Sequence, residues 1–254
     1  MDNVRRTRIS RLANALREFH IVDRFGLGDL LGEERIPGIE VFVAQLRRHD
    51  IGLPAGISVE DFAQVIRNSV IAGDAERAAN DKLAEALRQL KAIPWGTDGA
   101  SAYHEAAIAI IGLLWGNQIT LERKEAPMNG ARKKIDILYR NRFEPGFFRS
   151  LRDDHGIACP YIPFECKNYN GDPANPELDQ LAGRLTQRIG KLGILLCRGI
   201  DDARAVEDRC RGFKAKEEYL LVLTDNDLDQ IAKDRANGTN EQVLHSKLRD
   251  LLLS

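Results

Sequence analysis

The spacing of the apolar residues changes at a turn-rich segment, residues 94–99, and this change constrains the fold more than any other feature. Before the segment, apolar residues recur every three or four positions, as they do on one face of an amphipathic helix. After it, short alternating or wholly apolar runs, typical of β-strands, are interspersed with helical patterns. The 254-residue sequence therefore predicts an all-helical N-terminal domain, residues 1–95, and an α/β domain, residues 96–254.

The N-terminal domain is expected to consist of short helices. They cover residues 4–19, residues 38–48, a segment that begins at Ser58, and residues 75–92, where Pro94 ends the last helix. No catalytic spacing of residues occurs in this half of the sequence. Its expected roles are recognition, dimerisation or sensing, and the residues do not favour one of these over the others.

The α/β domain is expected to begin with a helix and three strands that can pair as a meander, after which helices and strands alternate. The expected elements are a helix at residues 100–115, strands at 118–126, 132–140 and 161–169, a helix at 176–189, a strand at 193–198, a helix at 203–216, a strand at 219–224 and two helices up to residue 253. This order predicts a mixed β-sheet core flanked by helices.

The composition excludes several classes of protein. With 37 Lys and Arg against 38 Asp and Glu, the chain is not a histone-like polycation. Its longest apolar stretch, residues 106–115, is half as long as the roughly 20 residues of a membrane span, and no secretory signal is expected. The four cysteines have neither CxxC nor zinc-finger spacing, so we expect no structural zinc, no disulfide framework and a cytoplasmic location.

Positive charge is concentrated in one stretch. From Arg132 to Arg152 there are seven basic and two acidic residues. Such a cluster is either a solvated surface or a segment that lies along the phosphates of a nucleic acid. The candidate DNA-binding residues within it are Arg132, Lys133, Lys134 and Arg140.

Two of the expected strands carry residues that can form a catalytic cluster. Glu165 and Lys167 share one face of the strand at 161–169, because alternate side chains of a strand point the same way. Asp136 is an acid on the otherwise apolar strand at 132–140. If these strands are neighbours, the two carboxylates and the lysine converge, and Mg²⁺ between the carboxylates would relieve their repulsion.

This arrangement, an acid on one strand and a Glu-x-Lys tripeptide on the next, resembles the motif of the PD-(D/E)xK nuclease superfamily. The match is Asp136 followed by Glu165-Cys166-Lys167, and Ile135 stands where the family name has a proline. The resemblance covers about residues 99–224 and implies a restriction-endonuclease-like fold. The residues around the motif are most similar to the Mrr-like and junction-resolvase-like branches.

Members of those branches often carry a glutamate on the preceding helix and a glutamine on the helix after the third strand. Glu105 and Gln180 occupy these two places. The catalytic residues that the resemblance implies are Asp136, Glu165, Lys167, Glu105 and Gln180. Its implied metal ligands, for Mg²⁺ with Mn²⁺ as a substitute, are Asp136, Glu165, Glu105 and the carbonyl of Cys166.

The resemblance implies metal-dependent hydrolysis of phosphodiester bonds by an endodeoxyribonuclease. The expected substrate is double-stranded DNA, and the helical front domain favours a restriction or phage-defence effector. A homodimer is expected by analogy with double-strand cutters of this fold, and a regulatory partner protein is compatible with it. No membrane partner is expected.

Each candidate residue also has a purely structural explanation. Asp136 can pair with Lys133 or Lys134, and Glu165 with Lys167 as a same-face ion pair. Glu105 suits the first turns of a helix, where acids are favoured, and Gln180 suits an exposed helix surface. These alternatives remain open.

Two alternative functions also remain open. One is a nucleic-acid-binding or sensor module that has this fold without catalysis, and the other is a nuclease acting on RNA or branched DNA. A second Glu-x-Lys, Glu122-Arg123-Lys124, has charges on both faces of its expected strand and no acid-bearing apolar strand before it. It predicts a solvent-facing strand with no catalytic role.

Overall fold

The computed structural model describes residues 59–128, 133–169, 171–236 and 241–253. The helices expected at residues 4–19 and 38–48 lie outside these residues. The chain divides into two compact units, residues 1–79 and residues 80–254. The second unit contains the whole sheet and every candidate site residue, and it begins before the turn-rich segment, inside a helix.

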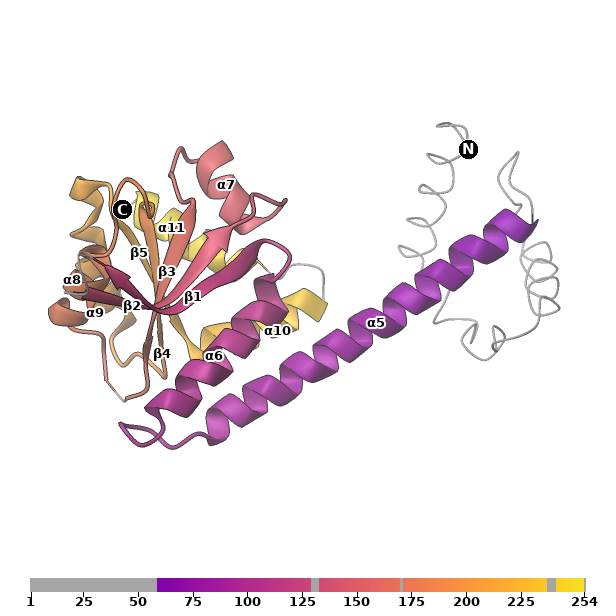
Figure 1. Cartoon of the computed structure of the whole chain (residues 1–254), viewed down its shortest axis with the longest axis horizontal. Helices are drawn as coiled ribbons and strands as arrows, with labels where there is room; N and C mark the ends of the chain where they lie inside the picture. The colour runs from indigo at the N-terminus through magenta and orange to yellow at the C-terminus, as the bar shows by residue number, and fades with distance from the viewer. Residues whose placement is uncertain (1–58, 129–132, 170, 237–240, 254) are drawn as a thin grey trace. The chain divides into compact units, whose positions relative to one another are not determined.

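A five-stranded mixed sheet forms the centre of the second unit (Figure 1). Its strands are β1 (Ile119–Met128), β2 (Lys133–Asn141), β3 (Tyr161–Lys167), β4 (Leu192–Cys197) and β5 (Tyr219–Thr224), in the spatial order β1-β2-β3-β4-β5. The first three strands pair antiparallel, which confirms the expected meander, and β4 and β5 continue the sheet parallel to β3. All five strands lie where the sequence predicts them, within two residues at each end.

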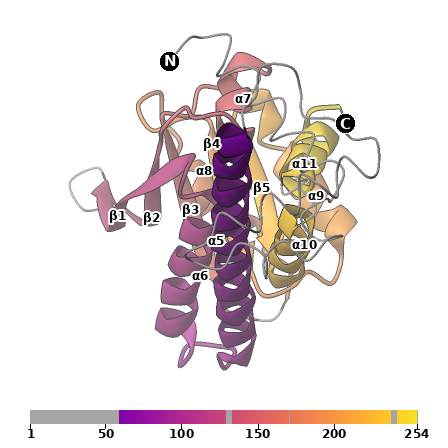
Figure 2. The same cartoon turned by 90° about the vertical axis from the view of Figure 1, so that its right-hand side faces the viewer.

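Helices flank this sheet, so the predicted α/β class with a mixed sheet is confirmed. They are α5 (Val59–Ala92), α6 (Ala100–Trp115), α7 (Phe147–Asp153), α8 (Asn175–Ala182), α9 (Ala203–Arg211), the 3-10 helix η1 (Lys214–Lys216), α10 (Asp225–Ala236) and α11 (Gln242–Leu253). α6 packs against β1 and β3, α8 against β3 to β5, and α9 to α11 around β5. Residues 80–92 of α5 run beside α6 (Figure 2). Within the described ranges, no helix combines the length and apolar character that a bilayer span requires.

The core follows from the apolar pattern of the strands and of α6. Every residue of β4 is buried, as expected of a central strand that helices cover on both faces. α6 contributes Tyr103, Ile110 and Trp115, each 0% exposed, and α5 contributes Leu90, also 0% exposed. The last turns of α5 therefore belong to the same core as the sheet.

The helices differ from the prediction more than the strands do. The two helices expected at Ser58 and at residues 75–92 are one continuous helix, α5. The helix expected at 176–189 ends at Ala182, because the next N–H groups, those of Arg184 and Leu185, bond to carbonyls three residues back and not four, so that the chain turns. The short helix α7 was not predicted, and the helix expected at 203–216 is interrupted at Gly212, which separates α9 from η1.

Candidate functional site

The sheet register brings the predicted acids together. β2 and β3 pair antiparallel, with Ile137 opposite Phe164 as the last pair toward this end, and Asp136 and Glu165 are the residues that directly follow that pair on the two strands. Alternation along the strands places both acids on one face of the sheet, while Ile137 and Phe164 point to the other. Lys167, two residues beyond Glu165, returns to the face of the acids.

Glu165 is paired on both sides of its carboxylate. Its side chain is 2% exposed, and Oε1 lies 3.0 Å from Nζ of Lys167. Its other oxygen, Oε2, contacts a guanidinium nitrogen of Arg184. A buried carboxylate needs such partners to remain ionised, since water no longer solvates it.

Asp136 lies at the accessible edge of the same cluster. Its side chain is 30% exposed, and Oδ1 lies 3.9 Å from the second terminal nitrogen of Arg184. One guanidinium group therefore contacts Glu165 directly and lies within ion-pair distance of Asp136. We name the group formed by Asp136, Glu165, Lys167 and Arg184 the acid–base cluster.

Arg184 is the residue of this cluster that the sequence analysis missed. Its side chain is 2% exposed, and burial lowers its pKa while the charge of Asp136 opposes that shift. The Arg184 N–H bonds to the Leu181 carbonyl at 3.0 Å in the turn that follows α8. A sequence signal existed: Arg184 lies between Leu181 and Leu185, at the spacing of the helix face that was expected to be buried.

The donor set of the cluster fits Mg²⁺ in type and number. Mg²⁺ takes hard oxygen ligands, is commonly held by one or two carboxylates and keeps several waters. Asp136 and Glu165 supply two such carboxylates, and one of them reaches solvent. In the described part of the chain, no group of three or more His, Cys, Asp or Glu side chains is placed to bind a metal, so water would complete the coordination.

The other three predicted site residues are placed differently. Glu105 is exposed on α6, and its carboxylate pairs with Lys124 of β1. Gln180 is exposed on α8. Cys166 belongs to β3 between Glu165 and Lys167, and its thiol lies on the opposite face, where burial raises its pKa.

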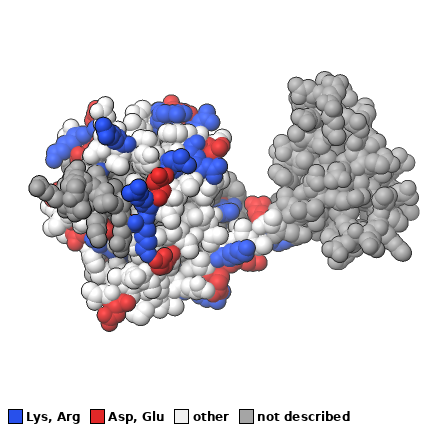
Figure 3. Space-filling model, in the orientation of Figure 1, with Lys and Arg blue, Asp and Glu red and all other residues white. Residues whose placement is uncertain are grey.

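The basic stretch is partly neutralised by neighbouring acids. Arg140 is exposed and lies 3.8 Å from Glu122, and both Arg149 and Arg152 pair with Asp153. Arg132 and the side chains of Lys133 and Lys134 lie outside the described residues. On the face shown in Figure 3, basic and acidic side chains are intermixed.

The second Glu-x-Lys is solvent-facing, as the sequence predicts. Glu122, Arg123 and Lys124 are all exposed on the edge strand β1. Glu122 pairs with Arg140 and Lys124 with Glu105. This tripeptide therefore provides a matched control for Glu165-Cys166-Lys167.

A buried polar group adjoins the cluster at the ends of the strands. Arg198 follows β4, is 6% exposed and donates from Nη1 to the Leu90 carbonyl at 2.8 Å. Its Nε lies 3.4 Å from Asp225, which also accepts a hydrogen bond of 2.9 Å from the Tyr103 hydroxyl.

Asn168, the residue after Lys167, donates hydrogen bonds of 2.9 Å to two carbonyls of the turn-rich segment. These contacts connect the end of α5 to the ends of β3 and β4.

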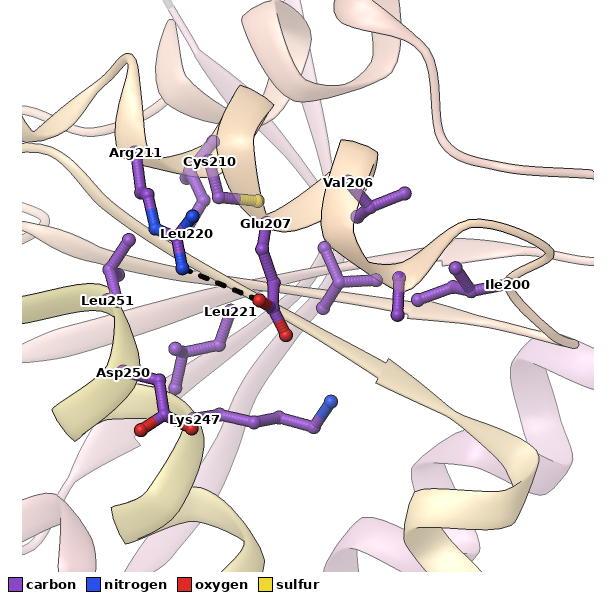
Figure 4. Close-up of a pocket in the computed structure, with 12 residues that line it drawn as sticks. Ile200, Val206, Glu207, Cys210, Arg211, Leu220, Leu221, Lys247, Asp250 and Leu251 are labelled. Atoms are coloured by element: carbon purple, nitrogen blue, oxygen red, sulfur yellow. Dashed lines mark ion pairs between the residues drawn. The ribbon is translucent and has the colours of Figure 1, made fainter. Parts of the chain in front are cut away.

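A small pocket lies elsewhere, between α9, β5 and α11 (Figure 4). Apolar side chains such as Val206, Leu220 and Leu251 line it, and Glu207 and Arg211 form an ion pair of 3.5 Å at its wall. None of its lining residues belongs to the acid–base cluster.

Comparisons with known proteins add no assignment to this geometry. A scan against protein-family models, a search of curated proteins and a search of solved structures each found no match to the chain.

Proposed function

We propose that this chain is a Mg²⁺-dependent endodeoxyribonuclease whose α/β unit has the restriction-endonuclease-like fold. The observation that carries the proposal is the shared face of Asp136, Glu165 and Lys167 on two paired strands. The meander followed by parallel strands, with helices on both sides, is the frame in which the resemblance expects these residues. Glu105 and Gln180 are less well supported, since both are exposed.

Each residue of the site would have a role that follows from its position. Asp136 and Glu165 would hold Mg²⁺, with the Cys166 carbonyl as a further ligand. When bound, the ion supplies Lewis-acid chemistry toward a phosphate oxygen and lowers the pKa of a coordinated water. Lys167 lies at the end of β3 with its ammonium 3.0 Å from Glu165, where it would orient the attacking water and offset developing negative charge.

The wider role follows from the resemblance and extends the proposal. The substrate would be double-stranded DNA, bound along the stretch that contains Arg140, and two chains would act together on the two strands. By the same resemblance, the protein would be a restriction or phage-defence effector in the cytoplasm, under the control of a partner protein.

Plasmid cleavage tests the proposed function. Supercoiled DNA is incubated with wild-type protein, Asp136→Asn, Lys167→Met and the control Glu122→Gln, with Mg²⁺ and with EDTA. We expect cleavage by wild type and by Glu122→Gln, and a loss of at least about a hundredfold for the other two, in line with the share of general acid–base groups in catalysis. Wild-type inactivity with Mg²⁺ and Mn²⁺, or equal cleavage by Lys167→Met, would refute it.

One observation favours a second candidate, a nucleic-acid-binding module without catalysis. Arg184 and Lys167 together already balance the charges of both acids, so the cluster is electrostatically satisfied without a metal. Such a module would bind DNA equally well in EDTA and would hydrolyse nothing. Cleavage assays with RNA and with a four-way DNA junction, run beside the plasmid assay, distinguish a nuclease that acts on RNA or on branched DNA from one that acts on double-stranded DNA.

A further inference from the structure

We propose that Arg184 is a displaceable internal counter-ion, which holds Asp136 and Glu165 together until a divalent cation takes its place. This inference rests on the proposed function, because it assumes that the two acids are the metal ligands. It makes Arg184 a positioning residue: the guanidinium keeps the carboxylates at the metal site and sets how tightly the metal binds.

The geometry shows that Arg184 and a metal ion would use the same oxygens. Its two terminal nitrogens lie on the Asp136 and Glu165 sides respectively, with 3.9 Å to Oδ1 of Asp136 and direct contact to Oε2 of Glu165. Mg²⁺ binds carboxylate oxygens at about 2.0–2.1 Å. A cation held by both carboxylates would therefore compete with the guanidinium for these oxygens.

The charges show why the two cations exclude each other. Two carboxylates, one ammonium and one guanidinium carry no net formal charge, and two of these four side chains are 2% exposed. Adding Mg²⁺ without removing a cation would leave two positive charges without a counter-ion in a poorly solvated site, which is strongly unfavourable. Of the two acids, Lys167 pairs with Glu165, whereas Arg184 pairs with both, so Arg184 is the cation that leaves.

The place of Arg184 in the chain suits such a movement. It is not in a strand but in the turn after α8, where Gly183 and Thr186 are exposed. Only the guanidinium has to move, since the backbone N–H of Arg184 is held by Leu181. A released guanidinium beside the metal would carry a free positive charge toward the phosphate of the substrate.

Removing the guanidinium tests the exchange by metal affinity rather than by activity. Mn²⁺ binding is measured by calorimetry for wild type, Arg184→Met, the double variant with Asp136→Asn, and the control Arg188→Met, an exposed arginine four residues on. We expect Arg184→Met to bind Mn²⁺ about tenfold more tightly or better, because no counter-ion competes for the oxygens. Arg188→Met should equal wild type, and Asp136→Asn should abolish the gain.

The same proteins separate failure of the inference from failure of the proposed function. If the wild type binds Mn²⁺ and Arg184→Met binds it no more tightly, the exchange is overturned, but the nuclease proposal stands. No binding by any variant overturns both. Tighter binding without DNA cleavage supports the exchange and refutes the nuclease.

If Arg184→Met fails to fold, a measurement on the wild-type protein still tests the exchange. Rotation of the guanidinium about its Nε–Cζ bond is followed by side-chain NMR during titration with Mg²⁺, with the Arg184 signal assigned from Arg184→Lys. We expect slow rotation without metal and fast rotation at saturation. A signal that stays slow while the metal binds overturns the inference.

Discussion

Two cationic side chains reach the buried carboxyl of Glu165 from different parts of the chain. Lys167 comes from the same strand and Arg184 from the turn after α8. Removing one partner of a buried pair commonly costs about 3–5 kcal/mol, since the remaining charge is left uncompensated. The first partner is visible in the sequence as an i, i+2 pair on a strand. The second is 19 positions away in the sequence, and only folding brings it to Glu165.

The four cysteines allow a prediction about single side chains. Burial raises the pKa of Cys159 to about 11 and those of Cys197 and Cys210 to about 12, and burial also raises that of Cys166. At pH 8 fewer than about one in a thousand of these thiols is the reactive thiolate. We expect a thiol reagent such as DTNB to modify all four slowly in native protein and quickly in denaturant.

The raised pKa values of these thiols also determine the direction in which the stability of the fold changes with pH. A thiol whose pKa is raised by folding favours the folded chain only while it stays protonated, so stability falls as pH rises above the ordinary thiol value of 9.0 toward about 11. Rapid modification of a thiol in the native protein at pH 8 would show that it is accessible and ionised, contrary to this expectation. Circular dichroism of the same sample controls for unfolding, because the native protein keeps its secondary structure.

At the scale of elements, Arg198 joins three of them. It donates to the carbonyls of Leu90 and Ile93 at the end of α5, at 2.8 and 3.2 Å, and it pairs with Asp225 at the start of α10. The last carbonyls of a helix have no partner within the helix. A single buried guanidinium after β4 therefore satisfies the end of α5 and compensates a buried acid.

Replacing this arginine should destabilise the fold. We expect Arg198→Met to lower the free energy of unfolding by about 3–5 kcal/mol, because Asp225 loses its counter-ion and the α5 carbonyls lose their donor. Arg88→Met is the matched control: Arg88 is 74% exposed and pairs with Glu85 on the helix surface, so its loss should stay within about 0.5 kcal/mol. Urea denaturation of both variants gives the comparison, and similar midpoints would contradict this account.

The sequence predicts strands better than helix ends, for a physical reason. A strand such as β5 is a short apolar run, and both its ends were predicted at Tyr219 and Thr224. Helix ends depend on contacts that a local pattern lacks. Apolar periodicity continues past Ala182, yet α8 ends there, because the chain turns at Gly183 and directs Arg184 to the sheet.

The candidate site shows the same difference between residues on strands and residues outside them. Asp136, Glu165 and Lys167 were found from strand alternation alone, because each lies on a strand whose neighbour the order of elements suggests. Arg184 was missed since its partners lie 48 and 19 positions away in the sequence. Glu105, which the resemblance implies as a metal ligand, is exposed and pairs with Lys124 of β1.

At the scale of the whole α/β unit, β3 joins two kinds of sheet. It pairs antiparallel with β2 and parallel with β4, so Glu165 lies where the meander meets the parallel half. β2 keeps one partly exposed acid at this junction, and β4 is entirely buried. The cluster therefore has one side open to solvent and one side in the core, which suits a site that has to hold charge and admit a substrate.

The extent of the folding unit gives a prediction for truncated chains. The core includes Leu83, Leu87 and Leu90 of α5, which are at most 5% exposed. A fragment of residues 96–254 starts after these leucines, whereas a fragment of residues 80–254 contains them. Full burial of one leucine contributes about 1.5–3 kcal/mol, so the shorter fragment loses on the order of 5 kcal/mol or more from a domain whose net stability is typically about 5–15 kcal/mol.

We therefore expect residues 80–254 to unfold in one cooperative transition and residues 96–254 to be unfolded or molten. Residues 96–254 would also leave Arg198 without the carbonyls of α5, which adds a buried, unsatisfied cation to the lost apolar contacts. Circular dichroism and thermal denaturation of the two fragments make the test. Leu90→Ala in the full chain is the point-mutation equivalent and should cost about 2–5 kcal/mol. Equal stability of the two fragments would mean that the end of α5 is not part of the core.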